Sequence, residues 1–147
     1  LEEELEAVDN YIYILNVRFA GDIHFSKKVE CDVENVRVPS MILQPVVENA
    51  IMHGVLPKQG FSTIKIAASR SGEGIVITVE NDGLPISAAR LDEVNSGLSQ
   101  AHKGLGLNSI HQRLQLLYGE GAGLTITSDE ESMKTVVEIR YGMKVKE

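Results

Sequence analysis

The chain has 147 residues, of which 43% are hydrophobic and 24% are charged, a balance typical of a single globular domain rather than a disordered chain. The formal net charge of −7, from 21 acidic and 14 basic residues, argues against nucleic-acid binding, which needs a basic face. No apolar run approaches the roughly 20 residues of a membrane span, and the single cysteine, Cys31, excludes an internal disulfide.

The first predicted element is a helix over residues 1–19. Its apolar residues are spaced 4-3-4-3-4, a helical period: Leu1, Leu5, Val8, Ile12, Leu15 and Phe19. This helix either packs on its own domain or arrives from a neighbouring one, and the pattern leaves both interpretations open. Because the sequence starts inside the pattern, without a Met or a signal peptide, we expect a piece of a longer protein.

The next segments predict a strand and a second helix. Residues 22–32 alternate loosely between polar and apolar, which indicates a strand or one arm of a hairpin. A strongly apolar helix is predicted over residues 41–53, and Gly54 ends it. Pro45 lies inside this stretch, so it either occupies the first turn of a helix that starts late or kinks the helix.

The second half of the chain is predicted to form two hairpins and one helix: strands 62–69 and 74–80, helix 107–118, and strands 124–128 and 135–141. The polar stretch before the helix has only a weak helical pattern, over residues 87–94. The element order is helix, strand, helix, hairpin, loop, helix, hairpin. That order favours an α+β fold, a mixed sheet covered by helices.

Three polar side chains crowd one flank of the apolar helix 41–53. Asn49 and His53 are one turn apart on one face, and Glu48 lies about 100° round the helix from Asn49. Burying such groups without partners costs at least about 1–3 kcal/mol, so each needs a partner. The partner is solvent or a neighbouring loop in one interpretation, and a ligand in the other.

Asn81, Asp82 and Gly83 follow directly after a buried strand. These residue types are typical of a turn at the end of a strand. The functional alternative is a hydrogen-bonding tip that reads the edge of a base.

A glycine-rich turn, Lys103-Gly104-Leu105-Gly106-Leu107-Asn108, leads into the helix 107–118. Exposed backbone N–H groups at a helix N-terminus form an anion site, and Lys103 adds a positive charge. Taken alone the motif is weak, because helix entries and tight turns also use glycine.

The order and spacing of these motifs resemble the ATP-binding catalytic domain of sensor histidine kinases, in the Bergerat fold shared with gyrase, the Hsp90 chaperones and the MutL proteins. Residues 43–54 resemble the N box of that family, Asn81-Asp82-Gly83 its first Gly box, and residues 104–107 with Arg113-Leu114 its second. The wording Leu-Gln-Pro-x-x-Glu-Asn-Ala is similar to the LytS/YehU-type branch. The resemblance implies a two-layer α+β sandwich, with a mixed sheet covered on one face by helices.

The resemblance also implies a domain division and an ATP site. Residues 1–20 would link from an upstream dimerisation and phosphoacceptor region, and residues 21–147 would form the catalytic domain. Asn49 would hold Mg²⁺ on the ATP phosphates, because an amide oxygen suits that cation. His53 would lie near the phosphates or ribose.

Adenine and phosphate contacts follow from the two Gly boxes of the resemblance. Asn81 and Asp82 would face the adenine amino group, and Gly83 would let the backbone approach the base. Residues 84–103 would form a mobile lid, with Lys103 as a cation for the phosphates. Backbone N–H groups would come from the turn itself: Gly104, Leu105, Gly106, Leu107 and Asn108.

The sequence departs from the family pattern in several positions. Asn81 stands where the family has Asp, although an amide can both accept and donate to adenine. Pro85 replaces a glycine, and Met52 replaces a lysine for which Lys103 or Lys58 could substitute. The usual Gly-Thr of the last hairpin reads Lys134-Thr135. ATP binding is compatible with these departures, and the sequence leaves open whether they weaken it.

One position separates a kinase from a hydrolase. In the ATP-hydrolysing relatives a Glu one turn before the Mg²⁺-binding Asn activates water, whereas here that position is Pro45. The catalytic residue is left open: Glu48 is a candidate, but it stands at the wrong angle for that role. We therefore expect little hydrolysis, and transfer of the γ-phosphoryl group to a histidine outside this chain.

The implied setting is a two-component system. The partners would be the upstream phosphoacceptor domain and a response regulator, within a homodimeric, membrane-anchored bacterial kinase whose catalytic domain is cytoplasmic and not itself inserted in the membrane. His24 and His111 are predicted to be surface groups. Two alternatives stay open: a degenerate nucleotide-binding or scaffolding module without phosphotransfer, and an ATPase of the same fold.

Overall fold

The computed structural model describes residues 1–18, 23–30, 36–39, 41–52, 61–72, 74–87, 89 and 107–142. The helices in this part of the chain are α1 (Glu2–Arg18), α2 (Leu43–Ala50) and α5 (Asn108–Tyr118). Its strands are β1 (Ile23–Val29), β2 (Ser62–Ser71), β3 (Gly74–Asn81), β4 (Gly123–Asp129) and β5 (Lys134–Gly142). The predicted order of elements is confirmed.

The strands form a mixed sheet in the order β1-β2-β3-β5-β4. Strand β1 pairs with β2 in parallel, with Ile23 opposite Ser62, and all other pairs are antiparallel. The alternative that residues 22–32 form a hairpin arm is therefore wrong. A parallel neighbour requires a crossover, and α2 lies in the connection between β1 and β2.

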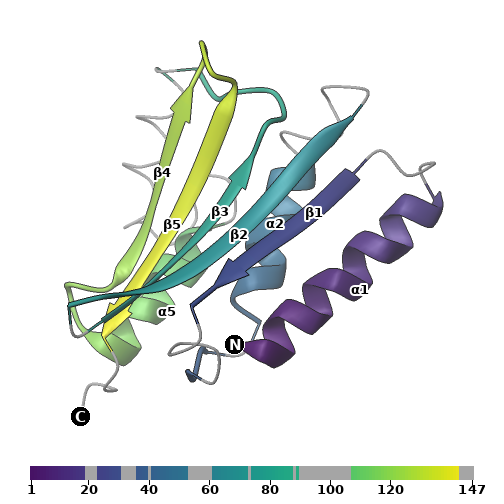
Figure 1. Ribbon diagram of the computed structural model, residues 1–147. Coiled ribbons are helices and arrows are strands. Elements are labelled where there is room, and N and C mark those ends of the chain that lie inside the picture. The colour runs from purple at the N-terminus through teal and green to yellow at the C-terminus, as the bar shows by residue number, and fades with distance from the viewer. Residues whose placement is uncertain are drawn as a thin grey trace.

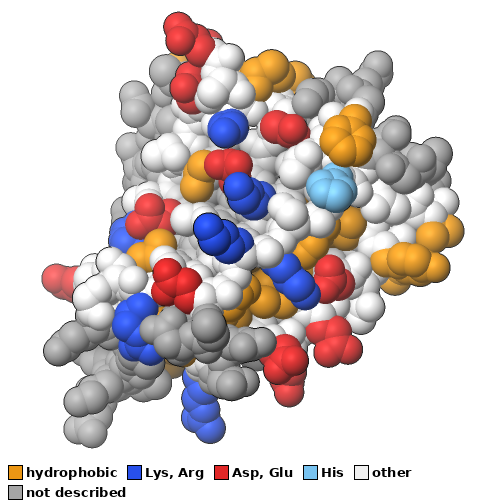
Figure 2. All heavy atoms as spheres, in the orientation of Figure 1, with side chains coloured by type: hydrophobic (Ala, Val, Ile, Leu, Met, Phe, Trp, Pro, Cys, Tyr) orange, Lys and Arg blue, Asp and Glu red, His pale blue; other side chains and the backbone are white. Residues whose placement is uncertain are grey.

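Figure 1 shows α2 and α5 behind the sheet, on one face, while α1 lies along β1. Helix α1 contacts both α2 and β1, so it closes the side of the same layer. The predicted α+β fold, a mixed sheet covered on one face by helices, is confirmed. The opposite face is open, and Figure 2 shows charged side chains of both signs spread over it.

The core lies between the sheet and the helices. Alternate residues of the strands face it, as the burial of Ile75, Ile77 and Val79 along β3 illustrates. Three apolar residues of α1 are buried in the same cluster, Leu5, Val8 and Ile12, together with Leu1 just before the helix. The helix thus packs on the domain in this structure. The division of the chain at residue 20 stays a prediction.

Helix α2 begins at Leu43, so Pro45 lies in its first turn and the late-start interpretation is confirmed. Its missing N–H falls where a helix offers no acceptor. The N-cap residue, Ile42, has no side-chain cap. Instead the Glu4 carboxylate of α1 accepts the backbone N–H groups of Ile42 (2.7 Å), Leu43 (3.1 Å) and Met41 (3.3 Å). A residue far away in the sequence therefore caps α2.

Strand β1 is an edge strand of the sheet, and α1 packs beside it. The Asn16 side chain donates to the carbonyl of Ile23 (2.8 Å) and accepts from its N–H (3.0 Å). Further along, Asp9 and Lys27 form an ion pair at 3.1 Å. A cavity of about 430 Å³ lies between these two elements and is lined by Glu2, Leu5, Glu6, Asp9, Lys27 and Val29. Among the described helices, none has the length and apolar character that a membrane crossing requires.

Candidate functional site

Small polar residues gather at one end of the sheet, on its helix-covered face. Each of four neighbouring strands carries one of them in line with its buried apolar residues: Ser62 in β2, Asn81 in β3, Thr135 in β5 and Ser128 in β4. The strand register places Thr135 opposite both Asn81 and Ser128. The Oγ atom of Ser62 is buried and has no hydrogen-bond partner within the described residues. These four residues, the polar row, lie at the boundary of the apolar core at this end of the sheet.

The end of β3 is a tight turn held by its own side chains. Asn81 is only 4% exposed, and its Oδ1 accepts the N–H of Gly83 at 2.9 Å. Asp82 Oδ1 accepts the N–H of Thr63 at 2.7 Å, which ties the turn to the start of β2. The turn that the sequence predicts is thus present. The NH₂ group of Asn81 makes no hydrogen bond to another described residue, so it has donors to offer.

Ser128 is a member of the polar row that the sequence interpretation missed. Its hydroxyl lies 2.8 Å from that of Thr135 and accepts the N–H of Ile86 at 2.9 Å. These contacts hold the segment after Gly83 against β4. The signal in the sequence is alternation, because Ser128 follows Leu124 and Ile126 on the buried side of its strand.

In α2 the polar residues Glu48 and Asn49 are half-buried beside the apolar face of the helix. Glu48 accepts a hydrogen bond from Gln44 at 3.2 Å. Burial, and then the charge of Glu48, raise the pKa of Tyr11 in α1, so this carboxylate lies near α1. A carboxylate engaged there is poorly placed to activate water. This agrees with its position on the helix, about 100° round from Asn49.

The start of α5 is buried in the packed core. Leu107 is 1% exposed and Asn108 is 7% exposed. The first backbone N–H groups of a helix have no partner within it, so this end carries a partial positive charge. Asn108 is the first residue of α5, so an anion bound at this end would meet these N–H groups.

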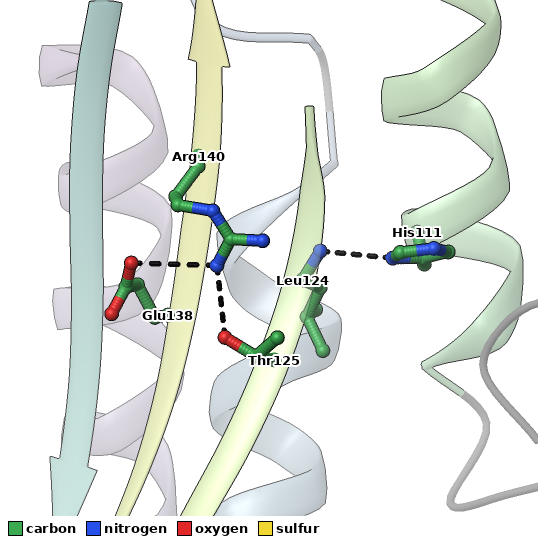
Figure 3. Close-up of polar contacts among 5 residues, drawn as sticks. All are labelled: His111, Leu124, Thr125, Glu138 and Arg140. Atoms are coloured by element: carbon green, nitrogen blue, oxygen red, sulfur yellow. Dashed lines mark hydrogen bonds and ion pairs between the residues drawn. The ribbon is translucent and has the colours of Figure 1, made fainter. Parts of the chain in front are cut away.

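His111 is not the free surface group that the sequence predicts. Its ring is half-buried, and Nδ1 accepts the backbone N–H of Leu124 at 2.9 Å (Figure 3). The prediction failed because a helical pattern does not reveal that the following strand returns beneath the helix. His24, by contrast, is exposed, and its ring stacks on Phe61 with centroids 6.2 Å apart.

The topology brings the described site residues toward one end of the molecule. Helix α2 runs back between two parallel strands, so its last turn, with Asn49, ends near the start of β2. Only residues 119–122 separate α5 from β4, and the two elements contact each other, so they run antiparallel and the first residues of α5 lie toward the end where β4 carries Ser128. Five predicted site residues lie outside the described part of the chain: His53, Lys103, Gly104, Leu105 and Gly106.

The described residues suit a cation such as Mg²⁺ that takes most of its ligands from a bound phosphate group and from water. Within the described residues, no three His, Cys, Asp or Glu side chains gather in a way that could hold a metal. A single amide oxygen, such as that of Asn49, suits Mg²⁺ when phosphate oxygens and water complete its octahedron.

The chain is similar in sequence to known proteins. Residues 34–144 match the family described as histidine kinase-, DNA gyrase B- and HSP90-like ATPase. The sensor histidine kinase YpdA of Escherichia coli is 33% identical over 121 residues, which are 82% of this chain and 21% of that protein. The sensor histidine kinase YesM of Bacillus subtilis is 32% identical over 137 residues, 93% of this chain and 23% of that protein. The chain thus spans between a fifth and a quarter of these relatives.

The fold is also found in solved structures. The histidine kinase ThkA, in a crystal structure of its complex with the response regulator protein TrrA, superposes with a TM-score of 0.69. The similarity covers 98% of this chain and 40% of that one, at 16% identity. At that identity the comparison shows the shared fold.

Proposed function

The chain belongs to the family of histidine kinase-, DNA gyrase B- and HSP90-like ATPases, and from this premise we propose that it is the ATP-binding catalytic domain of a two-component sensor histidine kinase. It would transfer the γ-phosphoryl group of ATP to a histidine outside this chain. The observation that carries the proposal is the polar row of Ser62, Asn81, Thr135 and Ser128, which ends the core where α2 and α5 also present polar groups.

The polar row suits the adenine end of a nucleotide. Adenine is flat and apolar on its faces and carries donors and acceptors on its edge, so it needs a cleft with a few fixed polar groups. Asn81 would donate a hydrogen bond from its NH₂ group to a ring nitrogen, while its oxygen already accepts the N–H of Gly83. Asp82 would act at the same edge, and its hydrogen bond to Thr63 fixes its position.

The phosphate end would lie at the helix termini. The N–H groups at Leu107 and Asn108 would bind phosphate oxygens, with Lys103, Gly104, Leu105 and Gly106 of the preceding turn. Asn49 would contribute an oxygen to Mg²⁺, which neutralises phosphate charge when bound. His53 would lie near the phosphates or ribose.

The proposed chemistry is transfer rather than hydrolysis. Pro45 lies in the first turn of α2, one turn before Asn49, and proline carries no group that could activate water. Glu48 is held by Gln44. Phosphoryl transfer depends mainly on positioning and charge neutralisation, so the domain can act without a base of its own.

The proposed partners are those of a two-component kinase: an upstream phosphoacceptor and dimerisation domain, and a response regulator such as the one that ThkA binds. The whole kinase would be a homodimer anchored in the membrane, with this domain in the cytoplasm. Its two named relatives here are sensor histidine kinases.

Calorimetry with AMP-PNP, with and without Mg²⁺, tests the nucleotide site. We expect binding that Mg²⁺ strengthens, loss of that strengthening in Asn49→Ala, and its retention in Asn49→Asp, which keeps an oxygen ligand. Binding without phosphotransfer would favour the scaffolding alternative. Absence of any binding would overturn the proposal.

Radiolabelled ATP tests the transfer step. The longer kinase that contains this domain should acquire acid-labile phosphohistidine, whereas the 147-residue chain alone should not become labelled. Rapid release of phosphate by the chain alone would point instead to an ATPase.

A further inference from the structure

The imidazole of His111 joins the start of α5 to the start of β4. His111 lies in the first turn of α5, and its backbone N–H donates to the carbonyl of Leu107 at 3.1 Å. Its side chain reaches across to the backbone N–H of Leu124 (Figure 3). The residue therefore connects the helix end at Leu107 and Asn108 to the sheet.

The imidazole ring of His111 lies against the backbone of β4 at Gly123, which has no side chain. A Cβ atom added to Gly123 would lie 2.6 Å from Cε1 and 2.8 Å from Nδ1 of His111. Real Cβ atoms essentially never come so close, so only glycine at this position lets the imidazole lie against the strand. The contact is thus a close fit between a side chain and a bare backbone.

The hydrogen bond requires a neutral ring. A protonated Nδ1 carries a hydrogen and cannot accept the N–H of Leu124. Burial lowers the pKa of His111, and the positive charge of Arg140 in β5 lowers it further. Arg140 is itself held by Glu138 at 3.4 Å and by Thr125 at 2.9 Å, whereas β4 presents no charged side chain at Leu124 or Thr125.

We propose that His111 is a positioning residue for the phosphate-binding end of α5, and that protonation of its ring loosens this end and weakens nucleotide binding. The inference rests on the proposed function for its effect on affinity. The connection between α5 and β4 stands on the geometry alone. A kinase built in this way would bind ATP less tightly when the surrounding pH falls.

The test compares AMP-PNP affinity, in the presence of Mg²⁺, at about pH 7.5 and about pH 5.5. Wild-type affinity should fall as the ring becomes protonated, by up to about threefold to tenfold, the worth of one neutral hydrogen bond. His111→Asn places an amide oxygen one bond beyond Cγ, as Nδ1 is, and does not titrate. It should bind like the wild type at the higher pH and lose less affinity than the wild type at the lower one.

His111→Asn also controls for the nucleotide, because the phosphates of AMP-PNP titrate equally in both proteins. His111→Leu, which has no acceptor, should show the weaker affinity at both pH values. A pH dependence of the same size in wild type and His111→Asn would overturn the inference. The wild-type series requires no variant to fold.

Hydrogen exchange of the α5 amides, measured without nucleotide and expressed as protection factors, separates this inference from the proposed function. Protection should fall at low pH in the wild type and stay constant in His111→Asn. If no nucleotide binds at any pH, the proposed function fails while the exchange data still test the connection. Unchanged protection across the pH range would overturn the connection itself.

Discussion

Helices α2 and α5 cover the same face of the sheet, but different chemistry fixes their first turns. The start of α2 is held by a carboxylate from another element, Glu4, which accepts three backbone N–H groups. The start of α5 is held by its own neutral imidazole, His111, which accepts one. An imidazole titrates within the physiological pH range, and His111 must be neutral at Nδ1 to accept the N–H of Leu124. The support of α5 is therefore sensitive to protons.

Packing should outweigh both supports. Leu114 of α5 is 0% exposed, and replacing it by alanine should lower the free energy of unfolding by about 2–5 kcal/mol through lost contacts and a cavity. Leu116→Ala, at a side chain that is 80% exposed on the same helix, should change it by less than about 0.5 kcal/mol. Urea unfolding measures both. Equal effects would show that α5 is not packed as described.

Loss of the carboxylate cap on α2 should have the next largest effect. Glu4→Ala leaves three N–H groups without their acceptor and should cost about 1–3 kcal/mol in the free energy of unfolding. Glu3→Ala, at an exposed neighbour, is the matched control and should be nearly neutral. If both variants unfold at the same urea concentration, Glu4 does not cap α2.

Acid should weaken the support of α5 selectively. In the unfolded chain His111 titrates near its usual pKa of 6.5, and in the folded chain its pKa is lower. Between these two values the unfolded state binds more protons than the folded state. The stabilising contribution of His111 to the free energy of unfolding is therefore fully present above pH 6.5 and decreases as the pH falls below it. We expect a loss of less than about 1 kcal/mol, absent in His111→Asn, in urea titrations across this range. A slope unaltered by that substitution would assign the loss to other groups.

The smallest effect should come from the ion pair between α1 and β1. Asp9 and Lys27 are each nearly half exposed, so Lys27→Met should change the free energy of unfolding by less than about 0.5 kcal/mol. Any difference should shrink further in high salt. A larger loss, insensitive to salt, would give α1 a stronger electrostatic role than its exposure suggests.

Local patterns predicted most of the fold. The alternation in residues 74–80 and the helical spacing in residues 107–118 depend only on neighbours in the sequence, and both elements are found within a residue or two of their predicted bounds. Pro45 lies in the first turn of its helix for an equally local reason, since its ring excludes the helix interior.

Contacts between distant residues could not be predicted. Glu4 caps a helix that begins 39 residues later, and no pattern in either segment of the sequence predicts this contact. The parallel pairing of β1 with β2 likewise depends on the path of the chain through α2. Of the candidate site, Asn81 and Asn108 lie buried at the polar end, as a shared pocket requires, while the role of each toward ATP stays a prediction.

The amide of Asn16 has a consequence for association between molecules. By occupying both the N–H and the carbonyl of Ile23, it imitates one residue of an adjoining strand. A strand from a second copy could not form hydrogen bonds to Ile23 at this edge, because both of its backbone groups are already bonded. Since unprotected sheet margins invite aggregation, a single side chain here helps the domain to stay dispersed at high concentration.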